Sequence, residues 1–158
     1  MGSGTAEVTL PTDTQIRVVR AFDAPRALVW RAYTTPELVR RWWAGRRGEV
    51  TSVEIDLRVG GRWRYVMVAT GGFEVAFHGE YREIAAPQRL VTTEVYEGAQ
   101  GDAALVTTTF NEADGRTTLE QVMEVASRDV RDAILATGME GGMQEAFDAL
   151  EAVAGELA

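Results

Sequence analysis

Apolar and polar residues alternate at positions 15–22, where Ile16, Val18 and Phe22 would point to one face of a half-buried strand. The preceding residues, 1–13, are small, polar and without period, so they predict a flexible N-terminal tail. A chain of 158 residues has the length of one domain. We therefore expect a single domain over residues 14–158.

Two helix starts follow this strand. Asp23 can cap a helix that has Pro25 near its first turn, and Thr35 can cap a second helix that has Pro36 at its first position. The helical period predicts two apolar faces, made by Val29, Ala32 and Tyr33 in the first helix and by Leu38, Val39 and Trp42 in the second. Two short helices are therefore predicted between the first strand and the rest of the chain.

The middle of the chain has the pattern of a β-meander. Short alternating segments are separated by turn signals such as Gly60-Gly61, Gly71-Gly72 and Asp114-Gly115. Connections this short imply antiparallel neighbours. The predicted strands are 50–57, 62–69, 73–83, 89–96, 104–111 and 117–125, which with 15–22 give an antiparallel sheet of six to seven strands.

A single apolar stripe marks the C-terminal segment as helical. Ser127 can cap a helix there, and apolar residues recur every three or four positions at Leu135, Met139, Met143, Phe147, Leu150 and Ala154. This pattern predicts one long helix. Gly138, Gly141 and Gly142 weaken it by about 1 kcal/mol each relative to alanine, so another contact must compensate or the helix must bend.

Composition and charge restrict the classes of partner that the protein can have. The formal net charge of −8 argues against nucleic acid, although Arg40, Arg41, Arg46 and Arg47 gather locally. The chain has no cysteine and no segment approaching the roughly 20 apolar residues of a membrane span, so we expect a cytoplasmic protein. Basic residues that are all arginine, with much alanine, glycine and valine, are typical of a GC-rich bacterial genome.

The residues of the common catalytic and metal sites are scarce. His78 is the only histidine, and alternation sets it opposite Phe77, away from the face that would be concave. Without cysteine, a transition-metal site is not expected, and no nucleophile elbow or nucleotide loop is present, so we expect no cofactor. Glu80 and Glu94 lie on predicted strands. If either turned inward, burial would raise its pKa and make it a candidate acid.

A curved sheet that grips one helix has a concave face rich in large side chains. These side chains either fill a core or line a cavity with walls that adapt their shape. The candidate lining residues are Trp42, Trp43, Trp63, Tyr65, Met67, Phe77, Tyr81, Met123, Met139, Met143 and Phe147. Of the two adjacent tryptophans, we expect Trp42 in the core and Trp43 near the mouth of the cavity.

Four stretches carry a family resemblance: FDAPRALVWRAYTTPELVRRWW, VEIDLRVGGRWRYVM, FHGEYREIAAPQRLVTTE and ATGMEGGMQEAFDAL. In matching order they resemble homologues of the activator of the heat-shock protein 90 ATPase, in the START and birch-pollen-allergen (SRPBCC) superfamily. The resemblance implies an α+β helix-grip fold, a curved antiparallel sheet wrapped around a long C-terminal helix.

Three hypotheses about function stay open. The first is non-catalytic binding of a small hydrophobic or amphipathic molecule, lipids included, since superfamily relatives bind lipids, polyketides or hormones. The second is a protein-interaction module that modulates a chaperone ATPase, as the family name implies. The third is a cyclase or hydrolase acting on a polyketide-like ligand. The sequence leaves open the ligand and the choice between monomer and homodimer.

Overall fold

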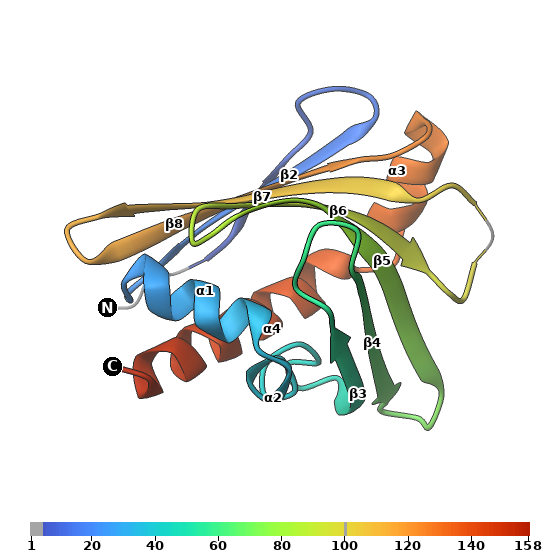
Figure 1. The fold of residues 1–158 in the computed structure, drawn as a ribbon. Helices are drawn as coiled ribbons and strands as arrows, with labels where there is room; N and C mark the ends of the chain where they lie inside the picture. The colour runs from blue at the N-terminus through green and yellow to red at the C-terminus, as the bar shows by residue number, and fades with distance from the viewer. Residues whose placement is uncertain (1–4, 100) are drawn as a thin grey trace.

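The computed structural model describes residues 5–99 and 101–158, and in it an antiparallel sheet curves around the C-terminal helix (Figure 1). The strands are β1 (Glu7–Thr9), β2 (Gln15–Phe22), β3 (Gly48–Ile55), β4 (Arg62–Ala69), β5 (Glu74–Ala85), β6 (Arg89–Tyr96), β7 (Ala104–Ala113) and β8 (Arg116–Glu124). Their order in the sheet is β1-β2-β8-β7-β6-β5-β4-β3. The α+β helix-grip fold is thus confirmed, with eight strands where six to seven were predicted.

The seven longer strands begin and end within two residues of their predicted limits. Turn residues explain this agreement, since they stop a strand whatever packs on it. Between β7 and β8, Asp114 and Gly115 have φ angles of 54° and 74°. Two successive positive φ angles give a tight hairpin whose twist matches that of its strands.

The eighth strand, β1, lies in the segment that was expected to be a flexible tail. β1 pairs with β2 in antiparallel register, Val8 opposite Val18. The Gln144 side chain holds the same segment from the other side: its Oε1 accepts from the Ala6 N–H at 2.9 Å, and its Nε2 donates to the Ala6 carbonyl at 2.8 Å. The prediction was wrong here because three residues are too few to show a period.

Two short helices, α1 (Arg26–Thr34) and α2 (Pro36–Val39), follow β2 as predicted. Their caps differ from the prediction. Pro25 stands at the N-cap of α1, so Asp23 does not cap it, and the Asp23 N–H donates instead to Glu151 Oε2 at 2.7 Å. Thr35 is the N-cap of α2, but its side chain makes no capping hydrogen bond.

The C-terminal segment forms two helices, α3 (Arg128–Ala136) and α4 (Met139–Glu156), so the prediction of one long helix was wrong. Ser127 caps α3 as predicted, its Oγ accepting from the Val130 N–H at 3.2 Å. Gly138 separates α3 from α4. Its φ of +79° is a left-handed conformation that glycine adopts without steric cost. The helix therefore breaks at Gly138, whereas Gly141 and Gly142 remain within α4.

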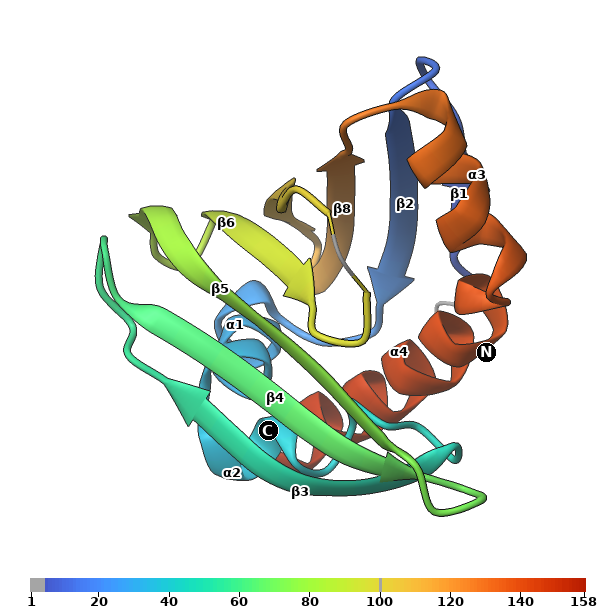
Figure 2. The same cartoon turned by 90° about the vertical axis from the view of Figure 1, so that its right-hand side faces the viewer.

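The C-terminal half of α4 packs into the core. It buries Leu150, Val153 and Ala154 on the concave side of the sheet, beside α1 (Figure 2). Arg20 of β2, 1% exposed, reaches Asp148 of α4 at 2.5 Å. The core thus occupies the β2, β8 and α1 side of the concave space.

No helix among the described residues has the length and apolar character that crossing a membrane requires.

Candidate ligand-binding cavity

A cavity of about 1180 Å³ lies between the concave face of the sheet and the N-terminal half of α4. Its walls come from strands β4 to β8, from α3 and α4, from the connection between α2 and β3, and from Tyr33 of α1. All eleven candidate residues line it: Trp42, Trp43, Trp63, Tyr65, Met67, Phe77, Tyr81, Met123, Met139, Met143 and Phe147. The structure thus brings these side chains together, and their role in binding a ligand stays a prediction.

The adjacent tryptophans of the α2–β3 connection have different surroundings. Trp42 is 4% exposed, stacks on Tyr33 with ring centroids 5.3 Å apart, and donates from Nε1 to the Ala32 carbonyl at 2.9 Å. Trp43 is half-buried and meets Tyr65 and Phe77 edge-on, at 5.4 and 5.8 Å. Trp42 therefore belongs to the core and Trp43 to the cavity wall.

The aromatic wall continues along β4 and β5. The Trp63 and Tyr65 rings lie 4.9 Å apart, and Phe77 lies 5.1 Å from Tyr96. Four half-buried methionines complete the lining: Met67 continues the β4 wall, and Met123, Met139 and Met143 come from β8 and α4. Unbranched methionine side chains change shape at low cost, so this side of the cavity can adapt to an occupant.

Gly79 gives the Trp63 ring its room. A Cβ at position 79 would lie 2.7 Å from Trp63 Nε1 and 1.8 Å from the Thr93 carbonyl oxygen, so only glycine fits. The Trp63 indole nitrogen is buried and, within the described part of the chain, has no hydrogen-bond partner. The absence of a side chain at Gly79 therefore lets the indole lie against β5.

A small group of polar side chains interrupts the apolar lining on the inner side. Gln121 of β8 donates from Nε2 to the Tyr33 hydroxyl at 3.0 Å and to Thr108 Oγ1 at 3.2 Å. Tyr33 and Gln121 were not among the residues predicted to line the cavity. The sequence did contain a signal for this polar group: Gln121 lies between Leu119 and Met123 on an apolar strand face, and a buried amide needs hydrogen-bond partners.

Glu94 of β6 also faces the cavity, and burial raises the pKa of its carboxyl to about 7. Glu94 also affects two nearby phenols. The pKa of Tyr33 is raised to about 12, mainly by burial and next by the Glu94 charge. The pKa of Tyr65 is raised well above its usual range, mainly by burial and in smaller part by Glu94. Strand parity grouped Glu94 with Leu90 and Thr92, and the structure puts all three on the cavity lining.

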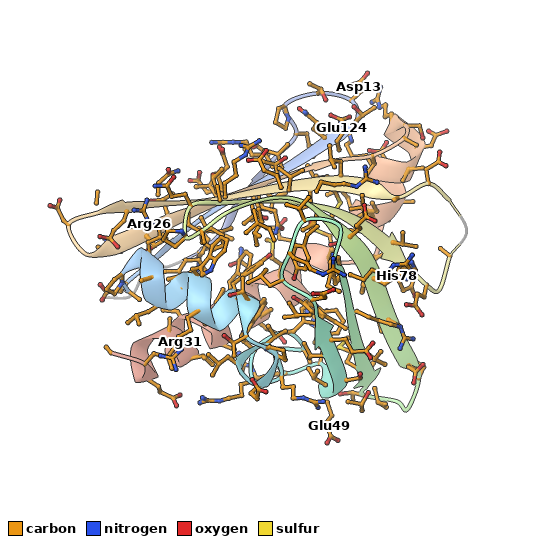
Figure 3. The ribbon with its side chains drawn as sticks, viewed as in Figure 1. Asp13, Arg26, Arg31, Glu49, His78 and Glu124 are labelled. Atoms are coloured by element: carbon orange, nitrogen blue, oxygen red, sulfur yellow. The ribbon has the colours of Figure 1, made fainter. Side chains whose placement is uncertain are left out.

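Two other candidate groups lie outside the cavity. Glu80 does not turn inward, since its carboxylate pairs with Arg82 at 3.0 Å on the outer face. His78 lies on the outer side of β5, away from α1 and α4 (Figure 3), as predicted, and its Nδ1 is 2.9 Å from Glu97. Alternation explains both positions, because their neighbours Phe77 and Tyr81 face the cavity.

A second depression, of about 800 Å³, lies on this outer face over β4, β5 and β6. Several of its charged groups pair with one another: Arg64 bonds Glu97 at 2.8 and 2.9 Å, and Glu97 also bonds His78. Within residues 5–99 and 101–158, no three acidic or histidine side chains come together in a way that would hold a metal ion. The inner cavity is therefore the stronger candidate site.

Known proteins share both the sequence pattern and the fold. The model of the family described as Activator of Hsp90 ATPase homolog 1-like protein matches residues 23–155. A solved structure from Rhodobacter sphaeroides is 26% identical, with a TM-score of 0.89 over 97% of this chain and 99% of that one. A protein from Mycobacterium smegmatis is 25% identical, with a TM-score of 0.86 over 95% and 96% of the two chains.

A more distant likeness concerns the fold alone. The solution structure of an AHSA1-like protein from Aeromonas hydrophila is 22% identical, with a TM-score of 0.65 over 89% of this chain and 93% of that one. No curated protein matches this chain in sequence.

Proposed function

This chain belongs to the family of Activator of Hsp90 ATPase homolog 1-like proteins, and from that premise we propose that it binds a small hydrophobic or amphipathic molecule without transforming it. The observation that carries the proposal is the cavity of about 1180 Å³ between the sheet and α4. Ligand sites are typically apolar hollows in which a few polar groups fix orientation. This cavity has that composition.

The walls favour an apolar guest over water. Aromatic rings and methionines dominate the lining, and water needs two to four polar partners to be held in place. Gly142 of α4 adds no side chain to the lining, and the Arg47 stem crosses the helix there, with its Cδ 3.6 Å from the position of a Cβ. An apolar body of drug or lipid size would bury most of its surface here.

A cavity-filling substitution tests the proposal. Thermal shift and tryptophan fluorescence against fatty acids, flavonoids and polyketide-like aromatics should find a compound class that raises the melting temperature. A ligand at a hundred times its Kd stabilises the folded state by about 2.7 kcal/mol. Met143→Trp should abolish the shift while the protein stays folded, because the new indole occupies the cavity.

Leu105→Trp is the matched control. Leu105 is 42% exposed on β7 and does not line the cavity, so the same side chain there should leave binding unchanged. If no compound class shifts the melting temperature, and Met143→Trp destabilises the protein as overpacking does, the interior is a filled core and the proposal fails.

A second candidate is a protein-interaction module that acts on a chaperone ATPase, as the family description suggests. Exposed apolar side chains at the cavity lining support it: Phe73 is 61% exposed, Tyr96 44% and Val130 42%. Phe73→Ser with Val130→Ser should abolish stimulation of an Hsp90 ATPase under this hypothesis. Under ligand binding alone, the same variant would change only access to the cavity. A cytoplasmic location stays a prediction under both.

A further inference from the structure

The cavity has no positive charge on its inner side. Of the residues that line it, the basic ones are Arg46 and Arg47, and both are exposed. Arg47 crosses α4 at Gly141 and Gly142 and turns toward Glu145, with Nε 3.4 Å from Oε2. Both cations of the lining therefore stay at its solvent side, where Arg47 pairs with Glu145 of α4.

The inner side carries hydroxyls, an amide and a carboxyl from five different elements. Tyr33, Tyr65, Tyr81, Glu94 and Gln121 come from α1, β4, β5, β6 and β8, and all line the cavity. We call these five residues the inner polar cluster. Gln121 bonds Tyr33, and Tyr81, Tyr33 and Glu94 all lie close enough to Tyr65 to help raise its pKa, so the five side chains lie near one another.

Part of this cluster is already used within the protein, and part is not. Gln121 Nε2 serves the Tyr33 hydroxyl and Thr108. The hydroxyls of Tyr65 and Tyr81, by contrast, make no hydrogen bond to any described residue, and neither oxygen is among the fully buried atoms that lack a partner, although both side chains are less than 10% exposed. Both residues line the cavity, so these hydroxyls are open to it and can bond a polar group on the guest.

We propose that the guest inserts a neutral hydroxyl, of an alcohol or a phenol, into the inner polar cluster, and that the cluster rejects a carboxylate at the same position. This inference rests on the proposed function, since it specifies the chemistry of the molecule that the cavity takes. A hydroxyl both donates and accepts, so it can donate to Glu94 while it accepts from a tyrosine. An ionised carboxylate only accepts and would face the Glu94 charge without a cation.

The protonation state of Glu94 makes the discrimination depend on pH. Burial raises its pKa to about 7, so below that pH the neutral carboxyl can donate to an acidic guest, and above it two carboxylates would share a dry site. The other titratable groups of the cluster are Tyr33, Tyr65 and Tyr81, and the pKa of each is raised, so they stay neutral. The remaining charged groups of the lining are Arg46, Arg47 and Asp102, all exposed.

Two matched ligand pairs test the proposal: 1-decanol with decanoate, and 2-naphthol with 2-naphthoate, each below its micellar or solubility limit. Calorimetric titration at pH 8 should give at least tenfold tighter binding of the neutral member in a pair that binds. The Kd of the carboxylate should rise by up to tenfold per pH unit above about pH 7, following one proton, while that of the alcohol or phenol changes less than twofold.

Glu94→Gln should remove most of this discrimination at pH 8 and flatten the pH dependence of carboxylate binding. The control is Glu120→Gln, since Glu120 lies on β8 outside the cavity and pairs with Arg17 at 2.7 Å. That variant should discriminate as the native protein does.

The outcomes separate this inference from the proposed function. Carboxylates that bind the native protein at pH 8 as tightly as their hydroxyl partners overturn the hydroxyl inference and leave ligand binding intact. A cavity that takes other compounds but neither hydroxyl probe also overturns it. Binding of no compound of any class overturns the proposed function itself. The pH series on the native protein decides the question even if Glu94→Gln does not fold.

Discussion

Glu94 and Glu97 stand three positions apart and have opposite electrostatic surroundings. Glu94 faces the cavity, where burial raises its pKa to about 7. Glu97, just beyond β6, receives hydrogen bonds from Arg64 and His78 on the outer face, which lower its pKa to about 2. The sheet, one residue thick, separates a carboxyl that is costly to ionise from one that is costly to protonate.

Glu94 should therefore make the folded state less stable as pH rises. Its pKa is about 7 in the folded state against an ordinary 4.5, so the folded state binds the extra proton between these values, and stability falls as pH rises from about 4.5 to 7. Glu94→Gln should match the native protein near pH 5 and exceed its unfolding free energy by about 1–2 kcal/mol at pH 8, after allowance for partial exposure. Urea unfolding at the two pH values measures this. An equal difference between the two proteins at pH 5 and pH 8 would contradict the assignment.

Strand parity was a limited guide to these residues. It grouped Glu94 with Leu90 and Thr92 and set His78 opposite Phe77, and both groupings are confirmed. Parity gives relative faces only, because a strand pattern does not say which face another element will cover. The inward position of Glu94 follows from the helices α1 and α4 on that side, which no local pattern of β6 contains.

At the scale of elements, capping and turn residues predicted where helices and strands end, but the apolar stripe did not predict whether the C-terminal helix is continuous. Ser127 caps α3 as predicted, and the strand ends agree with the turn residues. The apolar stripe from Leu135 to Ala154 nevertheless crosses a break, since Gly138 takes a left-handed conformation between α3 and α4. A hydrophobic period records which residues share a partner surface and not whether the helix between them is continuous.

Gly138→Ala should lower stability. A Cβ at this position meets no atom within 4 Å, so the expected loss of about 1 kcal/mol comes from the left-handed backbone alone. Gly155→Ala is the control, because Gly155 lies inside α4 with open space around it and should gain a few tenths to 1 kcal/mol. Urea midpoints of both variants measure the effect. A Gly138→Ala protein more stable than the native one would mean that α3 and α4 are continuous in solution.

At the scale of the molecule, the open curvature of the sheet leaves more space than α4 fills. The C-terminal half of the helix packs on β2 and α1, whereas its N-terminal half stands off β4 and β5 across the cavity. The sequence supplied the lining residues but not the volume, since the volume depends on the angle between a sheet and a helix that no single segment encodes.

No metal should be needed for this architecture to persist. The chain has no cysteine, and its one histidine is held by Glu97. A chelator such as EDTA should therefore leave the thermal midpoint unchanged in a calorimetric scan. A drop of several degrees that one specific ion restores would refute this expectation.

The pairing of β2 with β8 also sets the order in which the chain can fold during synthesis. Gln15 and Glu124, bonded partners at the end of this pairing, are 109 residues apart. A ribosome adds about 5–20 residues per second, so β2 waits for about 5–20 s before β8 emerges, and longer for α4. During that time the apolar side chains Ile16, Val18 and Phe22 have no β8 or α4 to cover them. The nascent chain thus exposes an apolar strand through most of its own translation. Its yield in a cell should therefore depend on the factors that shield such strands at the ribosome.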